Sequence, residues 1–177
     1  GTGKMTRATV DMGRPVLDPA QVPVSAEPDA TAPFGDPYAG ALELDSPWGA
    51  FAFCCVSMGN PHAVCFLDGT GLDEFDVDAV GAFFESHPAF PEKTNVEFAV
   101  VGPHGIAMRV FERGCGETLA CGTGACATAV AACLTGRAGR ETDVLLRGGT
   151  LHVAWADDGH VMMTGPAAES FAGTVNV

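Results

Sequence analysis

The sequence predicts an α+β fold in which a mixed, mostly antiparallel sheet curls as a barrel around one buried central helix. The first observation behind this prediction is a series of short β-prone runs separated by Gly, Pro, Asn and Asp. The second is the stretch Ala125–Leu134, which has almost no polar face. A helix that is apolar on all sides lies inside a protein core, and this one is too short to span a bilayer. A sheet that curls around the helix accounts for both observations.

The composition fits one globular domain spanning 1–177. With 177 residues, 47% of them hydrophobic, the chain is long enough to bury a core. Its net charge of −13 argues against nucleic acids and anionic membranes as partners. The seven cysteines lack zinc-site spacing, and free thiols suit a reducing compartment. No signal peptide or membrane span is visible, so we expect a cytoplasmic protein without a metal.

The chain begins with a strand and a long connection rich in proline. Met5–Met12 alternates loosely and predicts a strand that ends at Gly13. Six prolines then punctuate the stretch from Pro15 to Pro37. We interpret this stretch as surface, with Val22–Val24 as a short edge strand.

Two apolar β-prone runs follow, Ala50–Ser57 and Ala63–Leu67, with the sequence M-G-N-P-H between them. Its Gly and Asn-Pro content predicts a turn. A polar turn between two buried strands brings Asn60 and His62 to the end of a sheet, where binding sites are commonly built. The plain interpretation of His62 is a hydrogen-bonded surface histidine.

The middle of the chain predicts a covering helix and then a pair of strands. Asp76–His87 has apolar residues at helical spacing, with Asp76 as a cap, and Pro88 ends the helix. Thr94–Val101 and Gly105–Glu112 alternate as two strands around a Gly-Pro turn.

The last part of the chain predicts the end of the central helix and several short strands. Gly136 is placed to stop the helix. Asp158-Gly159 is a good hairpin signal. Four short strands are expected, at Thr142–Arg147, Thr150–Ala156, His160–Thr164 and Phe171–Val177.

The stretch R-V-F-E-R-G-C-G-E-T-L-A-C-G-T-G, from Arg109 to Gly124, carries the chemistry. Cys121 lies where the central helix begins, beside unpaired backbone N–H groups and the positive end of the helix dipole. We therefore expect the pKa of its thiol to fall from about 8.5 into a range of roughly 3.5–7.5. A carboxylate docked on the N–H groups of Gly122 and Thr123 would hold a substrate beside this general base.

Two other interpretations of the stretch stay open. A free cysteine is often plain core, and we interpret five cysteines that way: Cys54, Cys55, Cys65, Cys126 and Cys133. Cys121 differs because glycine and threonine follow it. A dinucleotide fingerprint is the second alternative, since Gly122, Gly124 and Ala127 spell G-x-G-x-x-A. Against it, Gly114–Ala120 separate this motif from the preceding strand.

Glu112 and Arg113 are adjacent, so their side chains point to opposite sides. A solvated charged pair of little energetic value is the plain interpretation. The functional interpretation is that Arg113 or its backbone holds a substrate carboxylate, while Glu112 faces the thiol and influences its protonation. We interpret Glu117 as a loop or capping residue.

Four motifs together resemble one known family. They are E-R-G-C-G-E-T-L-A-C-G-T-G-A-C-A around Cys121, M-G-N-P-H-A-V at Met58–Val64, T-N-V-E-F at Thr94–Phe98 and M-T-G-P-A at Met163–Ala167. In this order they resemble the motifs of diaminopimelate epimerases. The resemblance covers nearly the whole chain, but only about the C-terminal two-thirds of the family's usual protein.

The resemblance implies a cofactor-independent epimerase that interconverts LL- and meso-2,6-diaminopimelate for lysine and cell-wall synthesis. In that family, two cysteines from two similar domains exchange the α-proton in the cleft between them, and Cys121 matches one of the two. The implied catalytic residues are Cys121, Glu112 and His62, with His62 placed like the histidine thought to tune a catalytic cysteine. The implied substrate-binding residues are Asn60, Asn95, Glu112, Arg113, Gly122 and Thr123.

The family's other cysteine belongs to a C-G-N-G-like motif that this sequence lacks, and Cys115 lies on the same loop as Cys121. We therefore expect a missing N-terminal domain as a partner and no turnover by this chain alone. Segments 1–20 and 166–177 are expected to contribute strands that pair with that domain. The chain starts with Gly1 instead of methionine, so we expect its start to have been cut or processed.

No cofactor is expected, because both lysines, Lys4 and Lys93, lie in polar, turn-like surroundings unsuited to pyridoxal phosphate. The resemblance also allows a homodimer. Two alternatives remain open beside the diaminopimelate epimerase: a related cofactor-independent racemase or isomerase of the same fold, and a non-catalytic module that only binds.

Overall fold

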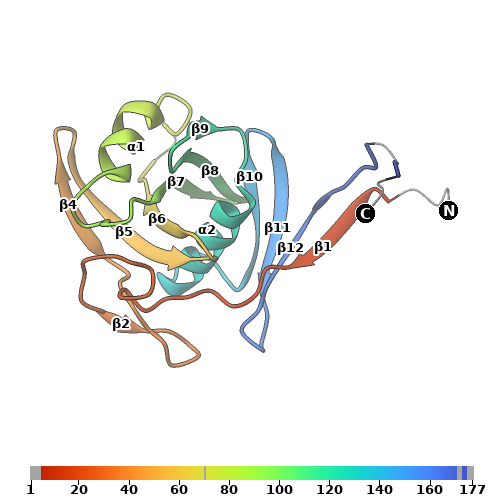
Figure 1. Cartoon of the computed structure of the whole chain (residues 1–177), viewed down its shortest axis with the longest axis horizontal. Coiled ribbons are helices and arrows are strands. Elements are labelled where there is room, and N and C mark those ends of the chain that lie inside the picture. Colours follow the sequence, from red (N-terminus) through yellow and green to blue (C-terminus); the bar gives the residue numbers. More distant parts are fainter. Residues whose placement is uncertain (1–4, 70, 171–172, 175–177) are drawn as a thin grey trace.

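The structure, a computed structural model, describes residues 5–69, 71–170 and 173–174. Within this part, two helices, α1 (Val77–Glu85) and α2 (Gly122–Leu134), accompany one large sheet (Figure 1). The strands of this sheet are β1 (Arg7–Asp11), β4 (Leu42–Ser46), β5 (Gly49–Ser57), β6 (Pro61–Phe66), β7 (Asn95–Gly102), β8 (Gly105–Glu112), β9 (Gly116–Thr118), β10 (Glu141–Leu146), β11 (Gly149–Trp155) and β12 (Val161–Pro166). A separate small pair is formed by β2 (Ala30–Thr31) and β3 (Pro37–Tyr38).

The strands of the large sheet follow the order β1-β12-β11-β10-β8-β7-β6-β5-β4, and β9 pairs with β8. Neighbouring strands run antiparallel except for two parallel pairs, β6 with β7 and β8 with β10. The predicted α+β class and mixed, mostly antiparallel sheet are therefore confirmed. Among the described residues, no pairing joins the two end strands, β1 and β4. Closure of the sheet into a barrel stays a prediction.

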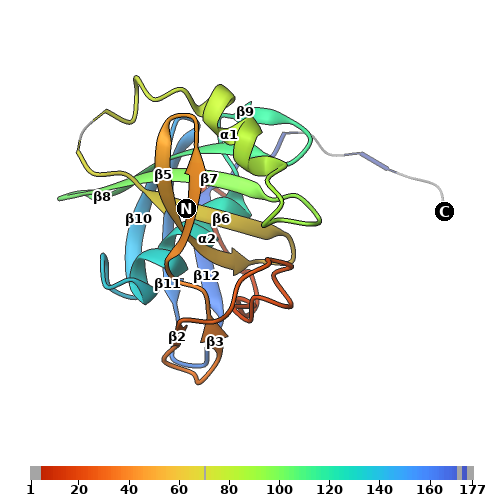
Figure 2. The ribbon, with the colours of Figure 1, turned by 90° about the vertical axis from the view of Figure 1, so that its left-hand side faces the viewer.

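Helix α2 packs against seven strands of the large sheet: β5, β6, β7, β8, β10, β11 and β12. Figure 2 shows it among these strands. All nine residues from Gly124 to Ala132 are buried, and none is larger than valine, so the strands can approach it closely. The helix ends where the sequence predicts, because Gly136 has a φ of +69°. The N–H groups of Gly136 and Arg137 then bond back to the carbonyls of Cys133 and Ala132.

Strand β5 separates two hydrophobic cores. Cys54 and Val56 belong to the core around α2, whereas Phe53 and Cys55 belong to the second core, beneath α1. Both faces of the second half of this strand, Phe53–Ser57, are therefore buried, and its sequence is a continuous apolar run instead of an alternating one.

Helix α1 covers the second core. Its cap, Asp76, accepts a hydrogen bond from the N–H of Ala79 at 3.0 Å, as the sequence predicts. The helix ends at Glu85, slightly before the predicted end at His87. Gly81 faces β8 so closely that an added Cβ would lie 2.4 Å from that of Phe111. Only a residue without a side chain lets this helix approach the sheet.

Most strands lie close to the predicted positions, but the proline-rich connection lies only partly on the surface, in its second half. Leu17, Val22 and Val24 are buried, so the first half of this segment packs onto the cores, whereas 27–31 and 33–37 are exposed. Val22–Val24 is not a strand, because the N–H groups of Val22 and Val24 bond back to residues four or five positions earlier, as in a turn. Proline stops regular structure without preventing the aliphatic side chains between from packing inward.

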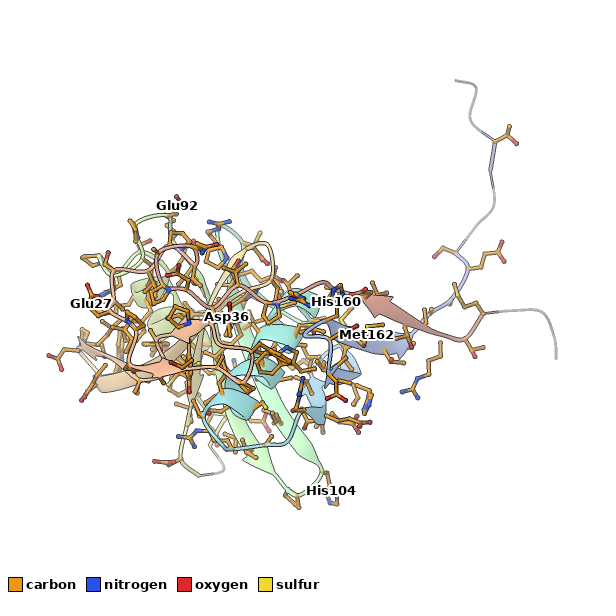
Figure 3. All side chains as sticks on the ribbon, turned by 90° about the horizontal axis from the view of Figure 1, so that it is seen from below. Glu27, Asp36, Glu92, His104, His160 and Met162 are labelled. Atoms are coloured by element: carbon orange, nitrogen blue, oxygen red, sulfur yellow. The ribbon has the colours of Figure 1, made fainter. Side chains whose placement is uncertain are left out.

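Strand β1 and the end of β12 project from the body as a two-stranded arm (Figures 1 and 3). Their register runs from Arg7 opposite Pro166 to Asp11 opposite Met162, and β1 is largely exposed. Pairing of segments 1–20 and 166–177 with another domain stays a prediction. The strand expected at Phe171–Val177 lies outside the described residues, apart from 173–174, which are not in a strand.

The buried cysteines predict a loss of stability at alkaline pH. Burial raises the pKa of Cys54, Cys65 and Cys126 to about 12 each, against about 8.5 in an unfolded chain. Below pH 8.5 both states keep these protons. Above it only the unfolded state releases them, so stability falls by up to about 1.4 kcal/mol per pH unit for each thiol.

Urea unfolding under reducing conditions between pH 8 and pH 10.5 measures this slope. Lysine and tyrosine also ionise in this range, but they do so equally in a Cys126→Ala variant. The slope of that variant should therefore be shallower by about the contribution of one thiol. Identical slopes for the two proteins would contradict the buried-thiol explanation.

Candidate functional site

Cys121 caps the N-terminus of α2. Its backbone is extended, with φ −136° and ψ 113°, and its Sγ accepts the N–H of Gly124 at 3.4 Å. The hydroxyl of Thr123 lies 3.4 Å from the same sulfur. Sequence analysis therefore placed this cysteine correctly at the helix start. The cap uses the N–H of Gly124, while the first two N–H groups, of Gly122 and Thr123, have no partner within the helix.

Gly124 lets a buried carboxylate lie against the first turn of α2. A Cβ at this position would be 2.8 Å from Oε1 of Glu97 and 3.3 Å from Sγ of Cys121. No larger residue fits between those two atoms without a shift. The thiol at the start of α2 and the carboxylate on β7 therefore both lie close to Gly124.

The pKa of the Cys121 thiol is raised above its ordinary value, which corrects the expectation of a lowered pKa. Burial is the main cause, because the side chain is only 8% exposed and a thiolate there loses its hydration. The hydrogen bonds from Thr123 and the Gly124 N–H lower the pKa, but the charges of Glu97 and Glu112 raise it. The sequence shows that the cysteine lies at a helix N-terminus, which lowers a thiol pKa, but it does not show how deeply the side chain is buried.

Glu112 is the last residue of β8, where its charge acts on Cys121. Its Oε1 accepts a hydrogen bond of 2.5 Å from the hydroxyl of Thr118 on β9. The carboxylate is therefore held in place by the strand that leads toward the cysteine. This is the arrangement in which Glu112 influences the protonation of the thiol.

His62 and Glu97 form a buried pair behind the thiol. Both side chains are 0% exposed, and Nδ1 of His62 lies 2.6 Å from Oε1 of Glu97. Nε2 of His62 lies 3.1 Å from Oδ1 of Asn60. His62 is thus not a surface residue, and the Met58–His62 turn does bring it together with Asn60, as expected.

Glu97 is a residue that sequence reasoning missed. The available signal was a charged residue inside the otherwise apolar strand N-V-E-F-A-V-V-G. Such a residue is rarely buried without a partner. Its partner became visible only from the parallel pairing of β6 with β7, which sets His62 opposite Asn95 and leaves Glu97 two residues further along.

Asn95 and Arg113 make contacts within the protein. The amide of Asn95 donates to the carbonyl of Pro61 at 2.8 Å and accepts the backbone N–H of Arg113 at 2.9 Å. It therefore ties the turn before β6 to the turn after β8. The guanidinium of Arg113 is exposed and donates to the carbonyl of Glu92 at 2.9 Å. A substrate contact for either side chain stays a prediction.

Glu117 is more than the loop or capping residue expected from the sequence. It forms a two-pronged ion pair with Arg109, at 2.7 and 2.8 Å, and also meets Arg147 at 3.0 Å. The hydrogen bonds from Arg109 lower the pKa of Glu117. The pair anchors β9, the strand that leads from Glu112 to Cys121.

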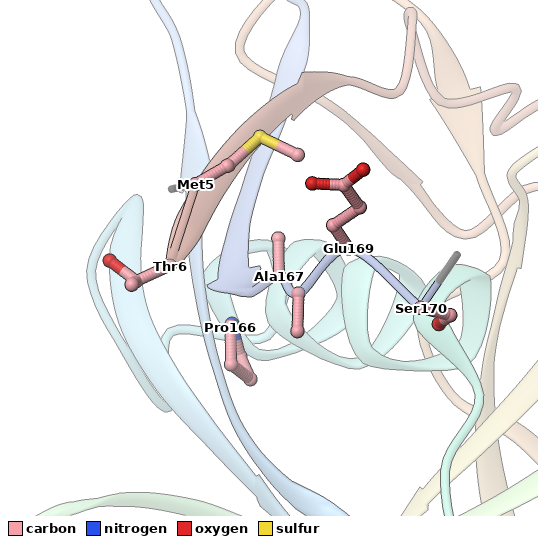
Figure 4. A pocket seen from close by; sticks show the side chains of 7 residues that line it. Met5, Thr6, Pro166, Ala167, Glu169 and Ser170 are labelled. Atoms are coloured by element: carbon pink, nitrogen blue, oxygen red, sulfur yellow. The ribbon is translucent and has the colours of Figure 1, made fainter. Parts of the chain in front are cut away.

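We also searched the described residues for a metal site, a membrane-spanning helix and a pocket away from Cys121. No group of His, Cys, Asp and Glu side chains in this part of the chain is arranged to hold a metal ion, and no described helix is long and apolar enough to cross a membrane. A hollow lies beside the arm (Figure 4) and is lined by Met5, Thr6 and the segment 166–170, without any of the predicted site residues.

The sequence is similar to known enzymes over nearly its whole length. A family model described as diaminopimelate epimerase matches residues 54–169. The chain is 48% identical over 173 residues to the diaminopimelate epimerase of Desulfovibrio desulfuricans, and 45% identical over 176 residues to that of Leptospira biflexa. These alignments cover 97% and 99% of this chain but 59% and 60% of the relatives. The chain therefore spans about 60% of the length of the curated relatives it matches.

The fold also resembles that of a solved enzyme. A hydroxyproline epimerase from Agrobacterium vitis, with bound trans-4-hydroxy-L-proline, superposes with a TM-score of 0.62 at 17% identity, over 91% of this chain and 50% of that chain. At such low identity this likeness shows a shared fold alone. The family model, by contrast, matches more than half of the chain and includes every predicted site residue. This chain belongs to the diaminopimelate epimerase family.

Proposed function

We propose that this chain supplies one half of the active site of an epimerase that interconverts LL- and meso-2,6-diaminopimelate. The observation that carries the proposal is the thiol of Cys121 at the start of α2, beside the N–H groups of Gly122 and Thr123, which have no partner within the helix. Family membership supports it. In the proposal, catalysis uses Cys121 with Glu112 and His62, and substrate binding uses Asn60, Asn95, Glu112, Arg113, Gly122 and Thr123.

The substrate binds through its reacting amino acid group. Its carboxylate accepts the N–H groups of Gly122 and Thr123, where the dipole of α2 favours a negative charge. As the α-proton leaves, negative charge spreads onto this carboxylate, so the same donors stabilise the carbanion more strongly than the substrate. This stabilisation takes the place of a cofactor that would act as an electron sink.

The raised pKa of Cys121 defines its resting state as the neutral thiol. In one direction of the reaction, this thiol transfers its proton to the carbanion, forming the Cα–H bond and leaving a thiolate. In the other direction, the thiolate removes the α-proton and the S–H bond forms again. The cationic amino group of the substrate favours the thiolate, because it offsets the charges of Glu97 and Glu112.

Inversion needs a second acid–base group on the opposite face of the α-carbon. The proposal assigns it to a cysteine in an N-terminal domain beyond these 177 residues. It further includes the pairing of segments 1–20 and 166–177 with that domain, curling of the sheet around α2 as a barrel, a cytoplasmic location and a homodimer.

Complementation tests the two-face mechanism. The chain by itself should not epimerise LL-diaminopimelate, because only one face of the α-carbon has an acid–base group. Joined to the N-terminal part of the Desulfovibrio desulfuricans relative, it should form meso-diaminopimelate, measured by chiral chromatography. Cys121→Ala in the joined protein should lower the rate by about 10²–10⁴-fold, whereas the exposed Cys115→Ser should not change it. Full turnover by the 177-residue chain would contradict the mechanism.

The substrate is tested with a panel of amino acids given to the same joined protein. LL-diaminopimelate should react at least about 10²-fold faster than proline or 4-hydroxyproline, because polar groups built to bind a second amino acid group lose their partners with a shorter substrate. Faster turnover of proline or its derivatives would favour a related racemase of the same fold. No turnover of any member would favour a module that only binds.

Alkylation of Cys121 tests its resting state. Only the thiolate reacts with iodoacetamide, so a raised pKa predicts slow reaction at neutral pH and a midpoint above that of an ordinary thiol. Peptide mass spectrometry of the chain after timed exposure gives the rate at each pH. The exposed Cys115, followed in the same samples, serves as the internal reference. Faster alkylation of Cys121 than of Cys115 at mildly acidic pH would contradict the neutral resting state.

A further inference from the structure

Glu97, which forms a buried pair with His62, is not among the catalytic or binding residues proposed above. Both side chains are completely buried, and Oε2 of Glu97 has no hydrogen-bond partner among the described residues. A buried ionisable pair of this kind is costly to maintain. The distances around His62 define which ring nitrogens carry protons. These protons in turn determine which end of the Asn60 side-chain amide faces a ligand.

The contacts of His62 require a proton on its outer nitrogen. Nε2 lies 3.1 Å from Oδ1 of Asn60, and a carbonyl oxygen can only accept. Nε2 must therefore donate. On the other side of the ring, Nδ1 and Oε1 of Glu97 are 2.6 Å apart, so a second proton lies between them. The pair holds two protons and is neutral overall, whereas removing one would leave an uncompensated buried negative charge.

The first turn of α2 decides which partner carries the second proton. Oε1 of Glu97 lies where a Cβ of Gly124 would be, only 2.8 Å from that position. The N-terminal end of a helix favours a negative charge beside it. This placement favours the carboxylate of Glu97 as the acceptor, with the second proton on Nδ1 of His62.

We infer that Glu97 is a positioning residue: it keeps His62 doubly protonated, and His62 in turn fixes the orientation of the Asn60 side-chain amide. With Oδ1 held by Nε2–H, the amino group of that amide stays free to donate, and none of the described residues accepts from it. A group with free N–H donors suits a carboxylate. That the carboxylate belongs to an amino acid rests on the proposed function, while the protonation of His62 does not.

A histidine whose Nδ1 faced no carboxylate would not fix this orientation. At neutral pH an ordinary histidine carries one ring proton, on either nitrogen. If Nε2 lacked its proton, Asn60 would turn its amino group toward the ring and present its carbonyl oxygen to the ligand, where it would repel a carboxylate. The charge on Glu97 removes this second arrangement. It acts from inside the core, without touching the ligand.

Nitrogen-15 NMR of the 177-residue chain at neutral pH tests the inference directly. The ring nitrogens of His62 are assigned through their bonds to the side-chain carbons. Both should show the chemical shift of a protonated nitrogen, which differs clearly from that of an unprotonated ring nitrogen. An unprotonated nitrogen in the His62 ring would overturn the inference. This measurement requires neither a variant nor a substrate.

Two matched variants identify Glu97 as the cause. In Glu97→Gln the charge that holds the second proton is gone, so the His62 ring should lose one of its two protons. In Glu112→Gln a carboxylate near the same thiol is neutralised without contact to His62, and the ring signals should stay as in the parent. Two protons retained in Glu97→Gln, or the same loss in Glu112→Gln, would overturn the assignment. The amide spectrum verifies that each variant is folded.

The result is independent of the proposed reaction. If the joined protein fails to epimerise diaminopimelate but His62 carries both protons, the proposed function fails and the role of Glu97 stands. If epimerisation occurs and His62 has a single ring proton, the role of Glu97 fails and the proposed function stands.

Discussion

The close approach of α2 to β7 at Gly124 is the constraint on which the site depends. Because this residue has no side chain, Oε1 of Glu97 and Sγ of Cys121 both reach the first turn of the helix. The sulfur then caps the helix, and the carboxylate links it to His62 and Asn60 on the neighbouring hairpin. A helix built almost wholly of small residues makes such an approach possible along its whole length.

The electrostatics of the site follow from the same packing. A helix N-terminus favours a thiolate, but Cys121 is also buried and has Glu97 and Glu112 nearby, so its pKa is raised. A thiol that its surroundings keep neutral is protected from unwanted reactions, because the thiolate is the reactive form. The contrast with the buried Cys126, whose pKa is raised by burial to about 12, shows how the cap and its donors limit the shift at Cys121.

The loops around the site are held by hydrogen bonds within the protein. Asn95 joins the turn before β6 to the backbone of Arg113, and the carboxylate of Glu85 accepts the N–H of Gly114 at 2.7 Å. Arg109 and Glu117 anchor β9 beneath the loop that carries Cys121. These contacts fix the loop between β8 and α2 against the two cores. The hydrogen-bond donors at the start of α2 are therefore preorganised.

The sequence by itself determined the elements and the place of the cysteine, because these depend on local patterns: apolar runs, caps, glycine turns and the cap position of Cys121. It also determined the family, through motifs that each lie within a few residues. Only the tertiary structure decided the pairing of His62 with Glu97, the anchoring role of Glu117, the burial of the first half of the proline-rich connection and the direction of the Cys121 pKa shift. All four depend on contacts between residues far apart in the chain, or on desolvation by the whole core, and neither quantity is encoded in a local spacing.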